Sequence, residues 1–445
     1  MNDQKNTKTG IRLFRRLMRR SFFLMLFWNI FSSQMACAAD HKIGLSGKVI
    51  MGYQGWFGCP GDFEKNNSWQ HWFLGSAQSN HFTVDLLPSV RGIKAEDLCD
   101  TGLRRPDNSP IQLFSSQNAS VVATHFRWMQ EHGIDGVAVQ RFLTDLATPE
   151  KKRRNDNVVK NVQKAAEANG RVFYVTYDIT GANPKTVTDD VRNDWHHLVD
   201  VLKITESPSY LLDRRKPVLQ LWGFGFDNRP GEADEVAVLI GDLKSGRGDL
   251  QAVTLIGGVP TFWRTLSGDS KKDPTWADVY RSYDVISPWS VGRFSNDEEA
   301  DAFVKRNVVP DIAETRRLGV GYMPVIFAGF SRYNLTVNYK RKEPTVLNKT
   351  PRNCGKFLWH QVSDLLDLHV DMLYAAMFDE VDEGTALFPA ETRQDKLPVG
   401  ASMVFLNQDG CSLPDDWYLR VTGKAAEYLR LHQPPPKNLD AVLKP

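Results

Sequence analysis

Eight short runs of β-branched or apolar residues recur along the chain, separated by longer amphipathic stretches. Strands that are buried on both faces read as continuous apolar runs, and their alternation with helices is typical of a parallel sheet. The pattern therefore predicts eight parallel strands. The eight runs are Val49–Gln54, Gly136–Gln140, Val172–Tyr177, Val218–Trp222, Val253–Gly257, Val285–Trp289, Met323–Ala328 and Met372–Phe378.

Most of the segments between these runs have a helix-like pattern of apolar positions. Eight strand–helix units fit an α/β fold of the (β/α)₈ or TIM barrel type, within its usual size range. A doubly wound open sheet is the main alternative, but no GxGxxG sequence follows the first run. The clearest predicted helices are Ala119–His132, Asn157–Ala168, Val187–Leu202, Glu232–Leu243, Asp297–Leu318 and Phe357–Leu368.

The pattern indicates a single barrel domain over residues 40–432, because no low-complexity block or Pro-rich linker divides it. The long segment from Phe57 to Asn118 is expected to be an elaborated loop after the first strand. Residues 433–445 begin with Gln-Pro-Pro-Pro, and we expect them to form a loose tail.

Residues 1–39 have the pattern of a secretory signal peptide. A basic segment ends in Arg19-Arg20, and the apolar stretch from Ser21 to Phe31 is too short to span a bilayer comfortably. The small residues Ala36 to Ala39 predict cleavage after Ala38 or Ala39. An uncleaved anchor and a lipoprotein acylated at Cys37 are the alternatives. We expect an exported protein, periplasmic or extracellular, with no membrane attachment after cleavage.

The charge of the chain argues against nucleic acid as a partner. The formal net charge is +2, of which residues 1–39 contribute +6, so the remaining chain carries −4. A protein without a net positive field is not expected to bind nucleic acid generally. The 12 Trp, 12 Tyr and 24 Phe exceed what a core usually needs, which suggests a stacking surface.

Four cysteines remain after the predicted cleavage: Cys59, Cys99, Cys354 and Cys411. Four cysteines allow three disulfide pairings, among which the sequence does not choose. Pairing nearest neighbours would give Cys59–Cys99 and Cys354–Cys411. No CxxC spacing occurs, so a zinc site is not expected. Four buried free thiols are the alternative, less suited to an oxidising compartment.

Aromatic and charged residues gather where the predicted strands end, which is where a barrel of this type holds its active site. Rings beside fixed carboxylates suit sugars, since the C–H faces of a pyranose stack on rings while hydroxyl groups need polar acceptors. Packing in the barrel mouth is the alternative for any single ring. The predicted substrate contacts are Tyr53, Trp56, Trp69, His71, Trp72, Arg141, Tyr177, Asp178, Trp222, Trp289, Asp379 and Asp382.

The segment Asp379-Glu380-Val381-Asp382-Glu383-Gly384 places four carboxylates directly after the last apolar run. Glycoside hydrolysis needs two carboxyl groups in different protonation states. Glu380 and Glu383 are three positions apart, so one helical turn or a tight loop would direct both to the barrel axis. A Ca²⁺ loop and a solvated acidic loop are the alternatives, although the EF-hand spacing is missing.

Other common catalytic signatures are missing from the sequence. No GxSxG precedes a helix, and neither HExxH nor GxxxxGK[ST] occurs, which removes the usual α/β-hydrolase, metalloprotease and nucleotide-binding signatures. We therefore expect neither a cofactor nor a metal ion in the site.

These residues resemble glycoside hydrolase families 99 and 71, which contain endo-α-mannosidases and α-1,3-glucanases. One similar segment is the aromatic motif after the first strand, with its W-x-H-W sequence. The other resembles the E-W-x-E-G-T segment after strand eight. The matching positions are Tyr53, Trp56, Gly58, Pro60, Trp69, His71 and Trp72 at the first segment, and Glu380, Glu383, Gly384, Thr385 and Pro389 at the second.

The resemblance implies a role for each glutamate. Glu380 would act as a base on the 2-hydroxyl of the substrate, and Glu383 as general acid/base on the glycosidic oxygen. The mechanism proposed for family 99 passes through a 1,2-anhydro sugar and retains configuration. The family's aromatic residue after the first glutamate is Val381 here, an extra acid, Asp382, precedes Glu383, and Gln54-Gly55 replaces part of the first motif.

The sequence thus predicts a secreted glycoside hydrolase that cleaves an α-linked oligo- or polysaccharide by acid/base catalysis with Glu380 and Glu383. A carbohydrate-binding barrel without turnover is the alternative, motivated by the substitutions around Glu380. A structural surface protein that binds no glycan is a third possibility. The sequence predicts no oligomeric state.

Overall fold

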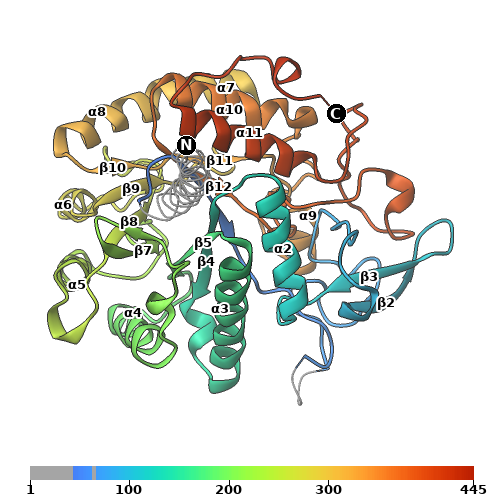
Figure 1. Cartoon of the computed structure of the whole chain (residues 1–445), viewed down its shortest axis with the longest axis horizontal. Coiled ribbons are helices and arrows are strands. Elements are labelled where there is room, and N and C mark those ends of the chain that lie inside the picture. Colours follow the sequence, from blue (N-terminus) through green and yellow to red (C-terminus); the bar gives the residue numbers. More distant parts are fainter. Residues whose placement is uncertain (1–43, 63–66, 445) are drawn as a thin grey trace, which may run out of the picture. The chain divides into compact units, whose positions relative to one another are not determined.

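The computed structural model describes residues 44–62 and 67–444, so the predicted signal peptide lies outside the described residues. All eight apolar runs form strands of one parallel sheet, and the predicted (β/α)₈ barrel is confirmed (Figure 1). All residues of the third predicted strand, Val172–Tyr177, are buried, which explains its unbroken apolar run. The barrel strands are β1 (Lys48–Tyr53), β4 (Gly136–Phe142), β5 (Val172–Asp178), β7 (Lys216–Trp222), β8 (Thr254–Val259), β9 (Val285–Pro288), β10 (Gly321–Tyr322), β11 (Val325–Phe327) and β12 (Met372–Ala376).

The barrel closes at its seventh strand, which consists of two pieces: β11 lies within the predicted run Met323–Ala328, and the short β10 directly precedes that run. β10 pairs with β9, whereas β11 pairs with β12, and β12 in turn pairs with β1. Between the two pieces, the Met323 N–H donates to the Ile286 carbonyl at 2.9 Å, and the Tyr374 N–H donates to the Pro324 carbonyl at 3.0 Å. Because proline has no N–H to continue a ladder, the strand changes partner at Pro324.

Helices surround the strands on the outside of the barrel (Figure 1). All six predicted helices are present. The predicted Asp297–Leu318 helix is interrupted by a π-helical segment, Val304–Val308, and a second such segment, His197–Val201, follows α4. The helices α6, α9 and α11 were not among the predicted ones. The helices are α2 (Ala119–Glu131), α3 (Pro149–Asn169), α4 (Val187–His196), α5 (Ala233–Ser245), α6 (Trp276–Arg281), α7 (Asp297–Phe303), α8 (Val309–Leu318), α9 (Tyr333–Asn338), α10 (Lys356–Asp367) and α11 (Trp417–Leu431).

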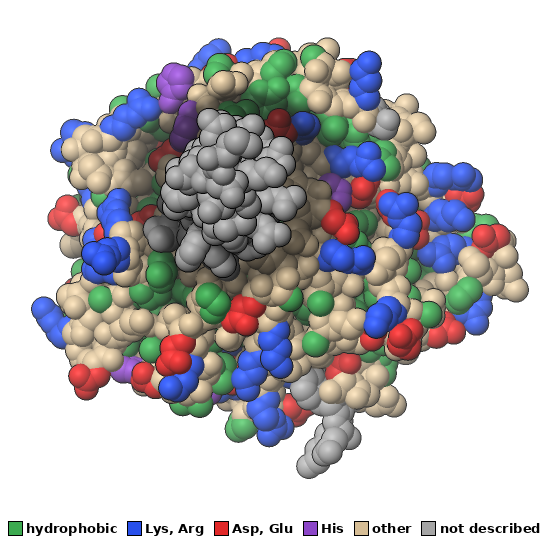
Figure 2. Space-filling view, viewed as in Figure 1, with side chains coloured by type: hydrophobic (Ala, Val, Ile, Leu, Met, Phe, Trp, Pro, Cys, Tyr) green, Lys and Arg blue, Asp and Glu red, His purple; other side chains and the backbone are tan. Residues whose placement is uncertain are grey.

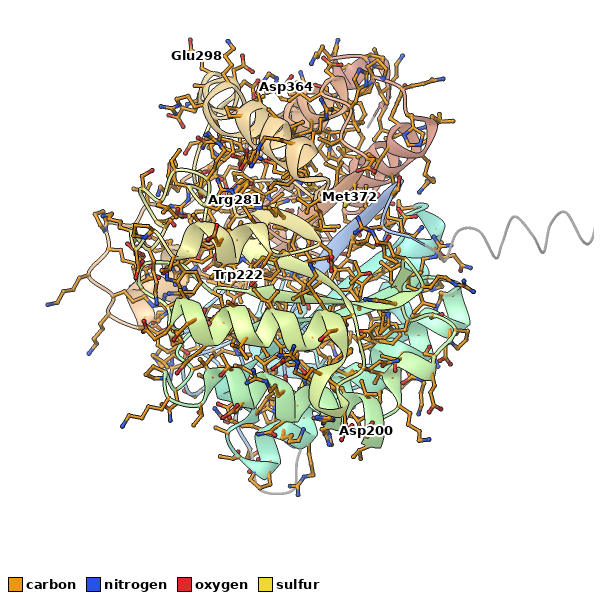
Figure 3. All side chains as sticks on the ribbon, turned by 90° about the vertical axis from the view of Figure 1, so that its left-hand side faces the viewer. Asp200, Trp222, Arg281, Glu298, Asp364 and Met372 are labelled. Atoms are coloured by element: carbon orange, nitrogen blue, oxygen red, sulfur yellow. A yellow bond between two sulfur atoms is a disulfide. The ribbon has the colours of Figure 1, made fainter. Side chains whose placement is uncertain are left out.

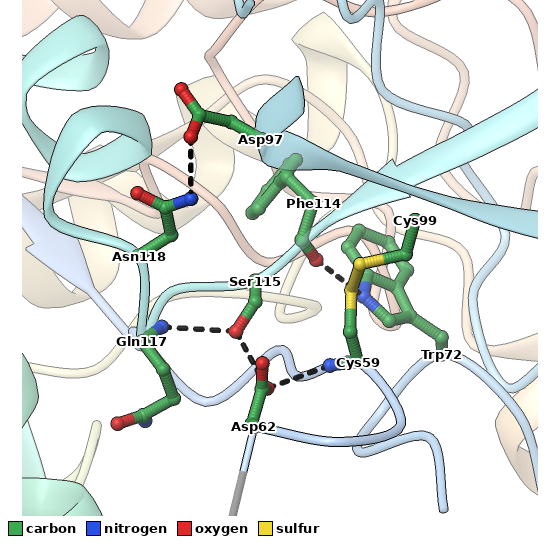
Figure 4. Close-up of a disulfide and its surroundings, with 9 residues drawn as sticks. All are labelled: Cys59, Asp62, Trp72, Asp97, Cys99, Phe114, Ser115, Gln117 and Asn118. Atoms are coloured by element: carbon green, nitrogen blue, oxygen red, sulfur yellow. Dashed lines mark hydrogen bonds between the residues drawn. A yellow bond between two sulfur atoms is a disulfide. The ribbon is translucent and has the colours of Figure 1, made fainter. Parts of the chain in front are cut away.

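The long loop after β1 carries an antiparallel hairpin, β2 (Leu98–Arg104) and β3 (Pro110–Phe114). The disulfide Cys59–Cys99 ties the beginning of the loop to this hairpin (Figure 4). The Asp62 carboxylate accepts hydrogen bonds from the Cys59 N–H at 2.8 Å and from the Ser115 hydroxyl at 2.7 Å. These contacts tie the beginning of the loop to its end, so the loop is cross-linked within itself.

The C-terminal part of the chain packs against the barrel. A second disulfide, Cys354–Cys411, links the start of α10 to the segment before α11. The expectation of a loose tail needs correction, because residues beyond 432 make defined contacts. Leu439 is buried, the Trp359 indole donates to the Pro436 carbonyl at 2.9 Å, and the Lys437 ammonium lies 2.8 Å from Asp364.

The surface carries charges of both signs. Lys and Arg side chains are interspersed with Asp and Glu on the face seen in Figure 2. Within residues 44–62 and 67–444, no helix combines the length and the hydropathy needed to cross a bilayer.

Candidate active site

The carboxyl ends of the barrel strands define one face of the molecule. In Figure 3, Met372 marks the start of β12 and Trp222 the end of β7, so the strands run toward the left of that view. Asp379 follows β12 and accepts hydrogen bonds from the N–H groups of Gln54 at 2.8 Å and Gly55 at 2.9 Å. Burial raises the pKa of Asp379 to about 7, although these two N–H groups lower it. The first and last strand ends are thereby joined.

Glu380 lies deep at the same strand end and is only 7% exposed. Its Oε1 accepts from the Gln54 side-chain amide at 2.9 Å, and its Oε2 accepts from the Thr385 hydroxyl at 3.1 Å. Burial raises the pKa of Glu380 well above its ordinary value, and the neighbouring carboxyl groups of Glu383 and Asp382 raise it further. A buried group of this kind keeps its proton to a higher pH than a free carboxyl group does.

Glu383 lies nearer to solvent, with a side chain that is 25% exposed, and forms an ion pair with Arg332 in which Nε and Oε1 are 3.1 Å apart. Burial raises the pKa of Glu383 to about 7, whereas the Arg332 guanidinium opposes this shift. A pKa near neutrality suits a group that both donates and accepts a proton during one reaction cycle.

Asp382 lies between the two glutamates in sequence, and 2% of it is exposed. Its Oδ2 is 3.6 Å from the Nδ1 atom of His71, while its Oδ1 has no hydrogen-bond partner among the described residues. An unpaired buried carboxylate oxygen is unfavourable without a donor. A hydroxyl group of a bound ligand would supply that donor.

One wall of the site is aromatic and comes from the loop after β1. The rings of Trp56 and His71 stack face to face, with centroids 4.2 Å apart and planes at 5°. Phe142, at the end of β4, lies 5.3 Å from the Trp56 ring. The backbone of His71 has a φ of 59°, a left-handed conformation that is uncommon outside glycine.

The opposite wall comes from the ends of β5, β7 and β9. Trp222 and Trp289 meet edge to face, with centroids 5.3 Å apart, and the Arg229 guanidinium lies over the Trp222 ring at 5.8 Å. Asp178 follows on β5, where its Oδ1 accepts from the Thr180 N–H at 2.7 Å. Burial raises the pKa of Asp178 to about 6, although Thr180 lowers it.

These walls enclose a cavity of about 740 Å³, a size typical of ligand sites. The catalytic candidates form part of its lining. Of the residues predicted from the sequence, the structure brings together Trp56, His71, Asp178, Trp222, Trp289, Glu380, Asp382 and Glu383.

Comparison with solved structures identifies a similar fold over nearly the whole barrel. A GH99 endo-α-mannosidase from Bacteroides thetaiotaomicron matches with a TM-score of 0.60 and 14% identity, covering 87% of this chain and 99% of the mannosidase chain. The same protein in complex with Bis-Tris propane gives a TM-score of 0.59, 14% identity and coverages of 87% and 98%. The fold is GH99-like.

This similarity confirms, at the level of the fold, the resemblance to family 99 that the two motifs indicate. By sequence, the chain matches no protein-family model and no curated protein. Residue roles therefore depend on the geometry of the site itself.

Within the GH99-like barrel, three aromatic residues of the first motif do not reach the cavity, so their expected contact with substrate is corrected to packing. Tyr53 is fully buried and its hydroxyl bonds to His125 at 3.0 Å. Trp72 is also fully buried, and its indole donates to the Phe114 carbonyl at 3.0 Å. Trp69 packs edge to face on Phe73, outside the cavity lining.

Arg141 and Tyr177 are likewise not in the cavity lining. The Arg141 guanidinium donates twice to Asp194, each time at 2.7 Å, and once to Asp156 at 3.0 Å. The Tyr177 hydroxyl donates to Asp194 at 2.8 Å. Both side chains point outward to α4, so they stabilise the barrel wall. Asp379 also does not line the cavity, because its carboxylate accepts hydrogen bonds from backbone N–H groups.

Sequence reasoning missed several residues of the lining. Gln54 and Gln140 end predicted strands, and each has a buried Oε1 without a hydrogen-bond partner among the described residues. Arg332 directly precedes α9, and Tyr339 and Arg341 follow it. Position at a strand end could have suggested the two glutamines, whereas the contribution of α9 needs the tertiary structure.

A possible metal ligand set lies far from this site in the fold, on α7 and α10. Asp301, His360 and Asp364 bring ligand atoms within 4.8 Å of one another. The Lys437 ammonium lies 2.8 Å from Asp364 and the His360 Nε2 atom lies 2.8 Å from Asp301. Asp364 and Asp301 thus already have partners within the protein, which leaves little reason for a cation there.

Proposed function

We propose that the chain is an exported glycoside hydrolase that cleaves an α-linked oligo- or polysaccharide, with Glu383 as general acid/base and Glu380 as its partner base. The observation that carries this proposal is the pair of carboxyl groups with raised pKa values in the lining of one cavity. Paired carboxyl groups with different tasks are the requirement of glycoside hydrolysis.

The environments of the two glutamates support different roles. Gln54 and Thr385 hold the carboxyl group of Glu380 by hydrogen bonds. Burial and the neighbouring carboxyl groups leave its pKa well above the ordinary value, although Thr385 lowers it, so its role as a base is taken from the resemblance to family 99. Glu383 is more exposed and closer to the cavity mouth, and its pKa of about 7 allows it to donate a proton to the glycosidic oxygen at neutral pH. Because the groups repel each other when both are ionised, the pair retains one proton over a wide pH range.

The α-linkage and the type of sugar follow from the resemblance to family 99. Among the departures from that family, Val381 is fully buried and does not line the cavity. Its carbonyl accepts from the N–H of Asp85 at 2.9 Å. The valine side chain therefore does not block the proposed roles of Glu380 and Glu383. Mannosides and glucosides are both suitable test substrates.

Export is supported by the two disulfides, Cys59–Cys99 and Cys354–Cys411, because disulfides persist in oxidising compartments. Expression of the whole chain with a C-terminal tag, followed by fractionation of the host cell and N-terminal sequencing, tests this part. Tagged protein that stays in the cytoplasm would contradict it.

The test of catalysis uses Glu383→Gln and Glu380→Gln on a panel of α-linked mannans and glucans. Each variant should lower turnover about 10³-fold, within the range expected for loss of an acid/base group, without a large change in Tm. The measurements are release of reducing ends and thermal unfolding. Near-wild-type rates in either variant would contradict the assignment.

A matched control is Glu391→Gln. Glu391 is also a partly buried glutamate with a raised pKa, paired with Arg105 at 2.9 Å, but it lies outside the cavity lining. It should retain activity. If the wild-type chain binds a glycan and returns it intact, the carbohydrate-binding alternative replaces hydrolysis.

A further inference from the structure

A basic and aromatic rim borders the cavity on the side of α9. It consists of Tyr339, Lys340, Arg341 and Lys342, which we call the basic rim. All four residues are exposed, and Tyr339 and Arg341 line the cavity.

The cations of the basic rim lack acidic partners. Among residues 44–62 and 67–444, no carboxylate lies within ion-pair distance of Lys340, Arg341 or Lys342, and the adjacent Glu343 pairs with Arg332 at 3.6 Å. The Arg341 guanidinium lies 5.8 Å above the Tyr339 ring. The result is an exposed ring with unpaired positive charge around it, on a chain whose residues after 39 carry a net charge of −4.

The basic rim is anchored to the same loop as the catalytic candidates. The Ser331 N–H donates to the Glu383 carbonyl at 2.9 Å, and the Asn334 N–H donates to Asp85 at 2.8 Å. Since Ser331 and Asn334 flank the start of α9, these bonds hold the rim at a set position relative to Glu383. A ligand in the cavity could therefore contact both.

The charges of floor and rim are opposite in sign. At the cleaved bond the lining of the floor holds three carboxyl groups, those of Glu380, Asp382 and Glu383, against the one guanidinium of Arg332 that pairs with Glu383. A negative group on the sugar being cleaved would therefore be repelled. A negative group farther along the same glycan would reach the basic rim and be attracted. The arrangement fits a chain that is neutral at the cleaved bond and anionic beyond it.

We propose that the basic rim binds an anionic sugar unit of the substrate, outside the two sugars joined by the cleaved bond. Its ring stacks on Tyr339, and its carboxylate or sulfate group pairs with Arg341 and the flanking lysines. This inference rests on the proposed function, for which it names the substrate class: an acidic glycan, carrying uronate or sulfate groups.

The test measures binding in the full chain carrying Glu383→Gln, so that the probes stay intact. The probes are polygalacturonate for carboxylates, dextran sulfate for sulfates and plain dextran for neutral glycans. At low salt, at least one acidic probe should bind. The triple variant Lys340→Gln/Arg341→Gln/Lys342→Gln should bind that probe about tenfold more weakly, and high salt should weaken the parent to a similar extent.

The matched control neutralises three other exposed cations, Lys160, Lys164 and Lys305, which lie outside the cavity lining. Its affinity should equal that of the parent. The inference is overturned if neither acidic probe binds, if both triple variants bind alike, or if duplex DNA binds the parent more tightly than either acidic glycan. The assay measures binding alone. A negative binding result therefore does not contradict cleavage by Glu383, and a wild-type chain without turnover does not contradict glycan binding at the basic rim.

Discussion

The ion pair between Arg332 and Glu383 sets the protonation of the proposed acid. The guanidinium lowers the pKa of Glu383 against the effect of burial, and the balance is a pKa of about 7. A general acid must hold its proton, so we expect activity to fall as the pH rises through about 7. Removing the guanidinium with Arg332→Gln should raise this pKa and move the alkaline limb of the pH–rate profile to higher pH.

The measurement is kcat/KM as a function of pH for the wild type and the variant. Arg105→Gln serves as the control, because it removes a guanidinium from Glu391 in the same way but outside the cavity. It should leave the alkaline limb in place. If the alkaline limb of the pH–rate profile is unchanged in Arg332→Gln, Glu383 is not the group whose titration governs activity.

Asp178 predicts a trade between stability and function. Its pKa of about 6 in the folded chain is above the ordinary value of 3.8, so the folded state holds a proton that the unfolded state releases first. The free energy of unfolding therefore falls as the pH rises from about 4 to about 6, by roughly 3 kcal/mol for this group. In the variant Asp178→Asn this pH-dependent fall in the free energy of unfolding should be absent.

Thermal unfolding across that pH range checks the sign. The Tm difference between Asp178→Asn and the wild type should increase from pH 4 to pH 6 and then level off. The same variant should lose glycan affinity, because Asp178 lines the cavity. A Tm difference that is constant with pH would rule out a buried, titrating Asp178.

Residue positions at strand ends were predictable, but side-chain directions were not. Successive side chains of a strand point to opposite faces, so a shift of one position decides between cavity and outer wall. Tyr177 points outward to Asp194, whereas Asp178, its neighbour, faces the cavity. Likewise Trp56 and His71 stack in the cavity wall, while Trp72 packs inside the loop. The sequence pattern alone does not determine which of these side chains face the cavity.

At the scale of elements, α11 approaches α2 so closely that one glycine matters. A Cβ atom at Gly423 would lie 2.1 Å from the His132 carbonyl oxygen, which forces the helices apart. We expect Gly423→Ala to lower the free energy of unfolding, even though alanine is the better helix former by about 1 kcal/mol.

The control is Gly241→Ala in α5, where a Cβ atom would meet no heavy atom within 4 Å. Here the propensity term acts alone, and stability should rise by about 1 kcal/mol. Denaturant unfolding of both variants measures the difference. Equal stabilisation in the two variants would contradict the close contact between α11 and α2.

Most elements of the barrel could be predicted because they are long or strongly apolar. β5 is buried throughout, and α10 buries one clear face. The split of the seventh strand could not be predicted, since a break at Pro324 depends on which neighbours the two halves meet. The short helix α6 and the hairpin β2–β3 also could not be recognised from the pattern of apolar positions.

At the scale of the whole molecule, the two disulfides hold the segments outside the barrel. Each closes a loop of several tens of residues, with separations of 40 and 57. Cross-links of this kind contribute about 3 to 4 kcal/mol by restricting the unfolded chain. Cys59→Ser/Cys99→Ser should lower Tm, and added reductant should lower the Tm of the wild type but affect this variant less. A wild-type Tm that does not respond to reductant would contradict these disulfides.

The seam between β1 and β12 has a consequence for how this chain matures. β1 forms near the start of the described chain, but its partner β12 begins only at Met372. Until then the first strand keeps one open edge, with backbone groups free to pair with another chain. A chain truncated before that residue would keep an unpaired strand edge and would be prone to aggregate. Degradation of truncated chains should therefore matter more for this protein than for one built from local hairpins.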